Sequence, residues 1–297
     1  MPRILALHGH GTSAAIFKAQ TASFRAKLPD SYSFEFIDAP FPSSPAAGIA
    51  AIYPAGPYYT WYAEQTPSAM RAAITHITAY MAEHGPYDAV CGFSQGCALI
   101  GSLLLYHARA VSNTDREDGH GHGDRDRIAD QNEQRVPFKA AIFICGGVPL
   151  WVLEDLGLPV SEAAREVHKT TSGLLSTTAG RLNAFAADTK LVPRGQGLWD
   201  ENLGTGALVH DGNVRPARGD VFGLDFTVFP QWATIGIPTG HVYGAKDPRW
   251  PAGIQLAELC DEETRVEFDT GGGHDIPRLS RVSEGIAGLV RRVLEAI

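Results

Sequence analysis

Residues 92–96 read Gly-Phe-Ser-Gln-Gly, a G-x-S-x-G pentapeptide that can present a serine as a nucleophile. An apolar run at 87–91 leads into it, and residues 97–110 leave it with the apolar spacing of a helix. This context predicts a strained strand-to-helix turn that projects the Ser94 hydroxyl above a sheet, at the N-terminus of the helix. The chemistry we expect is acyl transfer, with Ser94 attacking a carbonyl carbon. A serine that only caps the helix is the alternative.

A serine hydroxyl needs a base to take its proton, and the base needs an acid to orient it. On α/β sheets that carry such a serine, the acid follows it in the chain and the histidine follows the acid. Asp247 comes just after the apolar run 241–246, and His274 follows the run 266–269 through three glycines. Both positions fall at the carboxyl ends of expected strands, the edge at which Ser94 must lie. The competing candidates are His210 and His241 for the base, and Asp269 and Asp275 for the acid.

The loop GHGTSA, residues 9–14, follows an apolar run at 4–7 and admits two interpretations. It fits the G-x-G-x-x-G/A spacing of a dinucleotide phosphate loop, with Asp38 placed to bind a ribose. It also fits a turn whose backbone N–H groups stabilise an oxyanion. The serine motif favours the second interpretation and predicts the backbone N–H groups of Gln95 and His10 as the oxyanion donors. A dinucleotide-dependent oxidoreductase is the less favoured alternative.

Short apolar runs alternate with helical patterns, which predicts one α/β domain over residues 1–297 with a mostly parallel sheet of about six strands flanked by helices. Strands are expected at 4–7, 34–37, 89–91, 140–145, 240–243 and 266–268. Helices are expected at 66–83, 97–110 and 281–297.

Two segments interrupt this alternation. Residues 112–135 are charged and predict a polar, mobile insertion. Its stretch 120–126 lacks the spacing of a calcium loop, and we expect no metal site there. Residues 148–232 are too long for a structureless loop and predict a lid-like subdomain with helical pieces around 161–168 and 182–187. The alternative for this segment is a simple extension of the core.

The composition narrows the class of protein. Of 297 residues, 44% are hydrophobic, which excludes a disordered chain, and the net charge of −8 disfavours nucleic acid as a partner. No apolar run approaches the roughly 18 residues of a membrane helix, and we see no signal peptide. The four cysteines lack metal-binding spacing and are interpreted as buried thiols. We therefore expect a soluble, cytoplasmic protein without membrane contact.

Several of these stretches together resemble a known group of enzymes. They are LALHGHG, FEFIDAPFP, the aromatic segment GPYYTWY at 56–62, GPYDAVCGFSQGCALIGSLL, VYGAKDP and GGGHDIP. This set is similar to the eukaryotic "family of serine hydrolases" branch of the α/β-hydrolases, which includes small esterases and stand-alone thioesterases that release polyketides from carrier proteins. The resemblance covers residues 3–110, 138–147 and 235–297.

The resemblance implies a catalytic triad of Ser94, Asp247 and His274, and it makes Asp38 a structural residue. It also implies substrate binding by the aromatic segment, with packing under the loop as an equal alternative; the aromatic residues concerned are Tyr58, Tyr59, Trp61 and Tyr62, of which the first three are the specific candidates.

The expected function is hydrolysis of an ester or thioester of a medium-to-large acyl group through an acyl-enzyme, without a cofactor or metal. The expected substrate is a small-molecule or carrier-protein-bound acyl group, and release of a polyketide-type chain in secondary metabolism is the more specific expectation. Two alternatives stay open: a non-hydrolytic enzyme on the same fold, for cyclisation or retro-aldol cleavage, and a catalytically inactive binding protein. The sequence leaves the oligomeric state undetermined.

Overall fold

The computed structural model describes residues 1–117, 136–187, 199 and 215–297. Six strands form one sheet in the order β2-β1-β5-β6-β7-β8, and every neighbouring pair is parallel. The expected sheet is therefore confirmed. The strands are β1 (Arg3–Leu7), β2 (Ser33–Ile37), β5 (Ala89–Phe93), β6 (Ala140–Ile144), β7 (Thr239–Tyr243) and β8 (Arg265–Asp269).

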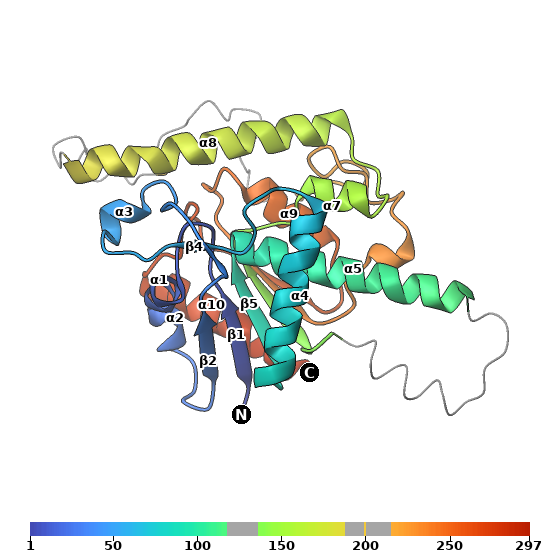
Figure 1. Ribbon diagram of the computed structural model, residues 1–297, viewed down its shortest axis with the longest axis horizontal. Coiled ribbons are helices and arrows are strands. Elements are labelled where there is room, and N and C mark those ends of the chain that lie inside the picture. Colours follow the sequence, from blue (N-terminus) through green and yellow to red (C-terminus); the bar gives the residue numbers. More distant parts are fainter. Residues whose placement is uncertain (118–135, 188–198, 200–214) are drawn as a thin grey trace.

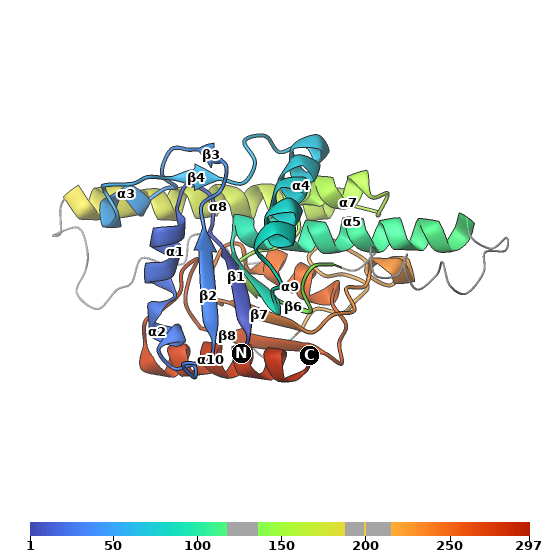
Figure 2. The ribbon, with the colours of Figure 1, turned by 60° about the horizontal axis from the view of Figure 1, so that its bottom comes forward.

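Helices cover both faces of the sheet (Figures 1 and 2). One layer contains α1 (Ala14–Gln20), α2 (Ala22–Arg25) and α10 (Ser280–Glu295), and the other contains α4 (Pro67–His84), α5 (Gln95–Glu117) and α9 (Trp250–Glu258). All residues of β5 and β6 are buried, as expected for central parallel strands with helices on both sides. Because both faces of these two strands are buried, their sequences are unbroken apolar runs.

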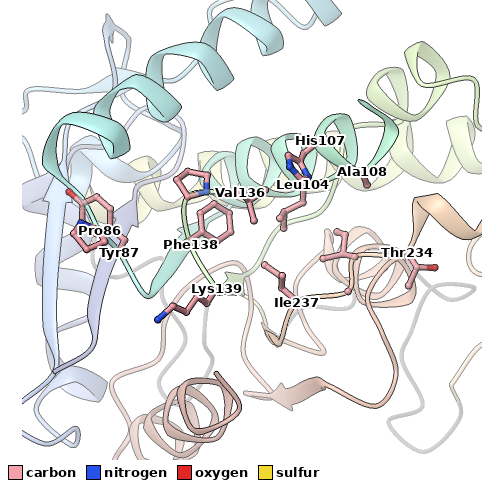
Figure 3. Close-up of a pocket in the computed structure, with 13 residues that line it drawn as sticks. Pro86, Tyr87, Leu104, His107, Ala108, Val136, Phe138, Lys139, Thr234 and Ile237 are labelled. Atoms are coloured by element: carbon pink, nitrogen blue, oxygen red, sulfur yellow. The ribbon is translucent and has the colours of Figure 1, made fainter. Parts of the chain in front are cut away.

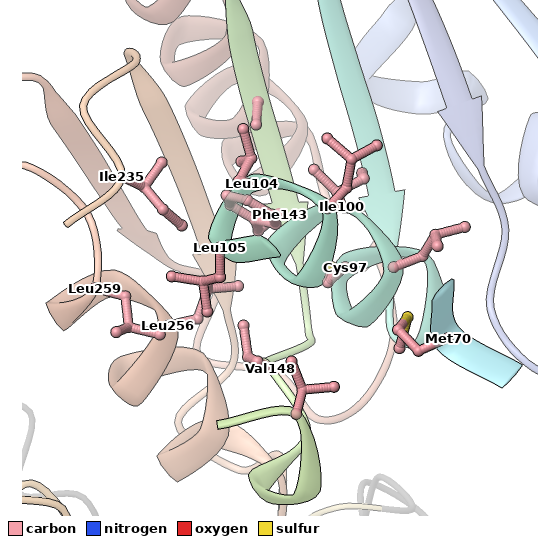
Figure 4. Close-up of a cluster of buried hydrophobic side chains, with 14 of the residues drawn as sticks. Met70, Cys97, Ile100, Leu104, Leu105, Phe143, Val148, Ile235, Leu256 and Leu259 are labelled. Atoms are coloured by element: carbon pink, nitrogen blue, oxygen red, sulfur yellow. The ribbon is translucent and has the colours of Figure 1, made fainter. Parts of the chain in front are cut away.

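Successive residues of each strand point to opposite faces, so each strand contributes to two separate cores. Leu5, Val90 and Phe143 belong to the larger core under α4, α5 and α9, while Ile4, Cys91 and Ile142 face α1, α2 and α10. Figure 4 shows the larger core around α5. All four cysteines are buried free thiols, as predicted.

A small antiparallel pair, β3 (Phe41–Pro42) and β4 (Tyr59–Thr60), lies beyond the carboxyl ends of the strands, near α3 (Ile49–Ile52) (Figure 2). Hydrogen bonds tie it to the loop after β1, from the Gly11 N–H to the Tyr59 carbonyl (2.9 Å) and from the Tyr59 N–H to the Thr12 carbonyl (2.7 Å). This pair therefore braces one wall of the edge at which ligands bind in parallel sheets.

Two expectations about the interrupting segments need correction. Helix α5 extends to Glu117, so the predicted polar insertion begins inside a helix, and its residues 118–135, with the stretch 120–126, lie outside the described residues. The two helical pieces expected around 161–168 and 182–187 belong to one continuous helix, α8 (Glu162–Ala187). The helix runs through the region between the two pieces without a break.

The segment 148–232 both covers the sheet edge and extends the core. Helix α8 passes over the carboxyl ends of the strands and contacts α3 (Figures 1 and 2). In contrast, α7 (Leu150–Asp155) and residues near the 3-10 helix η2 (Gln231–Ala233) bury side chains in the larger core: Val152, Leu153, Val221, Leu224 and Phe226. A lid role is therefore a prediction for α8 alone. None of the helices in the described ranges has both the length and the apolar character of a membrane span.

Candidate active site

Ser94 occupies the turn between β5 and α5 with a backbone φ of 51°, a region that non-glycine residues rarely adopt. The flanking glycines explain how the turn closes. A Cβ on Gly92 would lie 2.6 Å from the carbonyl carbon of Gly96, and one on Gly96 would lie 2.3 Å from the carbonyl oxygen of Leu7. The pentapeptide is thus a strained turn that needs glycine on both sides of the serine.

Three distant side chains meet in series at this turn. The Nε2 atom of His274 lies 3.0 Å from Ser94 Oγ, and its Nδ1 atom lies 2.8 Å from Asp247 Oδ2. The Asp247 side chain is fully buried, and its other oxygen accepts the backbone N–H of Arg249 at 2.7 Å. Because an ionised carboxylate only accepts hydrogen bonds, Nδ1 of His274 carries the hydrogen. Nε2 is then left to accept the proton of the serine.

Glycines also fix the loops that carry the acid and the histidine. A Cβ on Gly244, after β7, would lie 2.1 Å from the carbonyl oxygen of Gly272, after β8. The N–H of Lys246 donates to that same carbonyl at 2.9 Å. A Cβ on Gly273 would collide with the Trp199 ring at 2.1 Å. The glycines before His274 therefore allow close packing, rather than only the flexibility that their sequence suggests.

The competing base and acid candidates occupy other positions. His241 is buried, its Nε2 lies 3.0 Å from Thr239 Oγ1, and burial lowers its pKa to about 3. Asp269 accepts the backbone N–H groups of Ala245 and Gly271 and holds the loops together. His210 lies outside the described residues. Among the candidate acids, Asp247 is the one hydrogen-bonded to the ring of His274.

The loop after β1 lies beside the nucleophile because β1 pairs with β5. A Cβ on Gly9 would lie 3.3 Å from the Cβ of Ser94. Within the described part of the chain, no protein acceptor is recorded for the backbone N–H of His10 or of Gln95. Two donors next to the serine hydroxyl are what a developing oxyanion requires.

A threonine that the sequence did not single out connects the side chains of these two residues. Thr60 Oγ1 lies 2.9 Å from Gln95 Nε2 and 3.1 Å from His10 Nδ1. Its hydroxyl also lies within hydrogen-bonding distance of the carbonyl of Tyr62, at 2.9 Å. Thr60 is buried, and its contacts with His10 and Gln95 are partly buried.

Two further residues shape the first loop. His8 is fully buried, its Nε2 accepts the Ala39 N–H at 3.0 Å, and its Nδ1 lies 2.8 Å from the Gly9 carbonyl oxygen. This pattern requires a neutral ring with hydrogen on Nδ1, and burial lowers the pKa of His8 accordingly. Asp38 accepts the N–H of Ala14 at 2.7 Å, at the start of α1, a contact that suits a structural residue rather than a ribose ligand.

Two cavities open onto Ser94, and the same five residues line both: His10, Ser94, Leu175, Ser176 and His274. The first, here the polar compartment, has a volume of about 380 Å³ and is also lined by Tyr62, Gln65, Trp151, His168, Ser172 and Arg249. The second, the apolar compartment, has about 650 Å³ and is also lined by Pro45, Ala46, Ile49, Ile52, Phe93 and Trp199. Helix α8 contributes to both.

The aromatic segment reaches the polar compartment through Tyr62. Trp61 is fully buried, and its indole N–H donates to the His8 carbonyl at 2.8 Å. The Tyr58 hydroxyl donates to the Tyr53 carbonyl, and Tyr59 pairs through its backbone in β4. None of the three lines either compartment. Trp61 therefore fits the packing alternative, and substrate contact by the segment stays a prediction.

A further pocket of about 670 Å³ lies away from Ser94 (Figure 3). Its lining includes residues just before β5, β6 and β7, namely Tyr87, Phe138 and Ile237. This pocket therefore lies at the amino ends of the strands, opposite the edge at which parallel sheets bind ligands.

A family model described as "Serine hydrolase (FSH1)" matches residues 1–286. The chain belongs to this serine hydrolase family. Among related sequences, the esterase FPY3 of Fusarium mangiferae is 28% identical over 279 residues, which are 93% of this chain and 89% of FPY3. The hydrolase FUB4 of Fusarium oxysporum f. sp. lycopersici is 25% identical over 301 residues, covering 97% of each chain.

Among solved structures, that of SOBER1 from Arabidopsis thaliana matches with a TM-score of 0.45 and 16% identity over 99% of each chain. The family and the related esterases make this serine hydrolase an enzyme of the esterase and hydrolase class.

Proposed function

We propose that this enzyme cleaves an ester or thioester of a medium-to-large acyl group through an acyl-enzyme on Ser94. His274 takes the Ser94 proton as the hydroxyl attacks the carbonyl carbon, then gives it to the departing alcohol or thiol. A water molecule repeats the sequence on the acyl-enzyme and releases the acid. Asp247 holds the ring tautomer and stabilises the imidazolium that forms. No cofactor takes part in any of these steps.

The observation that carries this proposal is the uninterrupted series of contacts from Ser94 Oγ through His274 to Asp247, at 3.0 and 2.8 Å. Both distances are those of good hydrogen bonds before any substrate is bound. The carboxylate is buried, so its interaction with the imidazolium is little screened by water.

The negative charge of the tetrahedral intermediate needs donors that are already in place. We assign the backbone N–H groups of Gln95 and His10 to this role, since both flank Ser94 and neither has a recorded acceptor in the described part of the chain. The loss of one such donor typically raises the barrier by about 2.7–4 kcal/mol.

The two compartments support an acyl group larger than acetate. The apolar space of about 650 Å³ and the polar space of about 380 Å³ each fall within the range of small-molecule sites. Release of a polyketide-type chain from a carrier protein is the more specific form of the proposal. Helix α8, which lines both compartments, is the element we propose as the lid.

The test is the Ser94→Ala variant assayed on p-nitrophenyl and N-acetylcysteamine esters of increasing chain length. We expect hydrolysis to fall to background, and we expect a fluorophosphonate probe to label the wild type but not this variant. Ser102→Ala is the matched control, because this serine lies on the same helix, is fully buried and has no hydrogen-bond partner among the described residues.

Intact-protein mass spectrometry after incubation with acyl donors then reads the mass left on Ser94. Unchanged hydrolysis by Ser94→Ala refutes the mechanism. Probe labelling without ester or thioester hydrolysis supports the non-hydrolytic alternative, and absence of labelling supports an inactive binding protein.

A further inference from the structure

The guanidinium of Arg249 lies in the wall of the polar compartment, two residues after Asp247 in the chain. Its Nη1 atom lies 2.9 Å from both Thr171 Oγ1 and Ser172 Oγ and 3.2 Å from the carbonyl oxygen of His168. Its Nη2 atom lies 3.3 Å from His168 Nδ1. The side chain therefore reaches from the loop of the catalytic acid to helix α8, which covers the site.

All four of these acceptors are neutral. Burial and the Arg249 charge lower the pKa of His168 to about 4, so its ring is uncharged at neutral pH. Of the carboxylates in the described ranges, none forms an ion pair with the Arg249 guanidinium, and Asp247 uses its two oxygens for His274 and for the backbone N–H of Arg249. The positive charge thus faces the compartment without a carboxylate in contact.

Three other arginines of this protein form ion pairs with carboxylates. Arg265 is 5% exposed and pairs with Glu258 at 3.3 Å and with Glu267 at 3.2 Å. Arg215 and Arg218 also pair with Glu258, which is 2% exposed. Arg265, the buried arginine among these three, is therefore paired with carboxylates.

Arg249 is partly buried, and burial lowers its pKa, although the nearby charge of Asp247 opposes this shift. A carboxylate is the group that best pairs with this side chain, because two parallel N–H donors of the planar guanidinium match its two oxygens. An arginine has five N–H donors, and no acceptor is recorded for Nε of Arg249 within the described residues. Donors are available for a ligand.

We propose that Arg249 determines substrate specificity by binding a carboxylate of the substrate in the polar compartment while Ser94 attacks the ester or thioester. The inference rests on the proposed function and names the substrate class: an acyl ester or thioester that carries a second, free carboxylate. Ser172, which contacts Arg249, lies one helical turn of about 5.4 Å from Ser176, which lines both compartments. Arg249 and Ser94 line the same compartment, so one substrate can contact both.

The experiment compares matched substrates with the full-length enzyme. The acyl-side pairs are p-nitrophenyl hemi-esters of adipate, pimelate and suberate, each against its neutral methyl ester. The leaving-group pair is 3-carboxy-4-nitrophenyl butanoate against p-nitrophenyl butanoate. Each is assayed with wild type, Arg249→Met and Arg249→Lys, and the readout is the ratio of kcat/KM for the anionic substrate to that for its neutral partner. Spontaneous hydrolysis is subtracted from every rate.

We expect the wild type to favour at least one anionic substrate by about tenfold or more. Arg249→Met, which keeps an unbranched side chain without charge, loses that preference, and Arg249→Lys keeps part of it. The pair that responds tells whether the carboxylate belongs to the acyl part or to the leaving group. Because a ratio is measured, a general loss of activity from a loosened α8 does not mimic the result.

Arg109→Met is the matched control, since the guanidinium of this arginine stacks on Trp232 at 4.8 Å and does not line either compartment. Equal ratios in wild type and Arg249→Met across all pairs overturn the inference and leave the proposed function intact, with Arg249 serving only to hold α8. Hydrolysis that survives Ser94→Ala overturns the proposed function instead.

Discussion

Thr60→Val is the substitution that most directly tests the proposed oxyanion donors, the backbone N–H groups of Gln95 and His10. Valine keeps the shape of threonine but deletes the hydroxyl that contacts Gln95 at 2.9 Å and His10 at 3.1 Å. The loop with His10 then loses a tether on the side that faces Ser94. The catalytic groups themselves remain present.

The expected magnitude follows from what remains in place. Full loss of one oxyanion donor costs about 2.7–4 kcal/mol. Two backbone hydrogen bonds, Gly11 to Tyr59 and Tyr59 to Thr12, still hold the loop in Thr60→Val, so we expect about half of that loss. A barrier increase of about 1.4–2 kcal/mol corresponds to a kcat about 10–30-fold lower, since 1.36 kcal/mol is a factor of ten. KM changes little, because the oxyanion contact forms only in the transition state.

The assay is steady-state hydrolysis of a p-nitrophenyl ester that the wild type accepts, with Thr60→Ser as the control. Serine keeps the hydroxyl and loses only a methyl group, so its kcat stays within a few-fold of the wild type. A Thr60→Ser variant as slow as Thr60→Val refutes the reasoning, and so does a loss carried by KM. Thermal unfolding of all three proteins separates this effect from a loss of folded enzyme.

Two further predictions concern the acid and a buried histidine. Asp247→Asn keeps the shape of the acid but favours the wrong His274 tautomer, and we expect kcat to fall by about 10⁴, the loss typical of a triad whose acid becomes an amide. Asp275→Asn in the same ester assay loses far less, and similar losses for both would contradict the assignment. His241 has a folded-state pKa of about 3, below its unfolded value of about 6.5, so the unfolded chain binds more protons between these pH values. The contribution of His241 to the free energy of unfolding is therefore fully present above about pH 6.5 and decreases as the pH falls toward 3. Urea unfolding across that pH window should show a smaller decrease in the free energy of unfolding for His241→Gln. The same pH dependence in both proteins would argue against a buried neutral ring.

Much of the sheet can be predicted because its strands are buried on both faces. Burial forces unbroken apolar runs such as 140–144, and these are visible in the sequence whatever the neighbours are. The candidate triad was accessible for a related reason. In a parallel sheet all carboxyl ends lie at one edge, so residues just after three strands meet without detailed knowledge of the packing.

The roles of neighbouring residues were less accessible. In the segment 58–62 the sequence shows only a run of aromatic side chains, and nothing local distinguishes the buried Trp61 from Tyr62 at the cavity wall. The difference depends on the Trp61 indole reaching His8, 53 residues earlier. Helix α8 was predicted as two pieces because its middle is polar. The side chains that contact Arg249 lie in this polar part of the helix.

The sequence by itself predicted the order of the six sheet strands along the chain, the strained serine turn and the three loops that follow β5, β7 and β8, because glycine spacing and apolar periodicity are local properties. Only the tertiary structure decided that Thr60 joins Gln95 to His10, with Thr60 and Gln95 35 positions apart in the chain. It also decided that Arg249 reaches α8, whose contacting residues lie 77–81 positions earlier. Polar contacts of this kind carry no periodic signal, since a single hydroxyl or guanidinium is chosen by whatever backbone packs against it. The proposed specificity therefore depends on such contacts, whereas the proposed chemistry depends on motifs visible in the sequence.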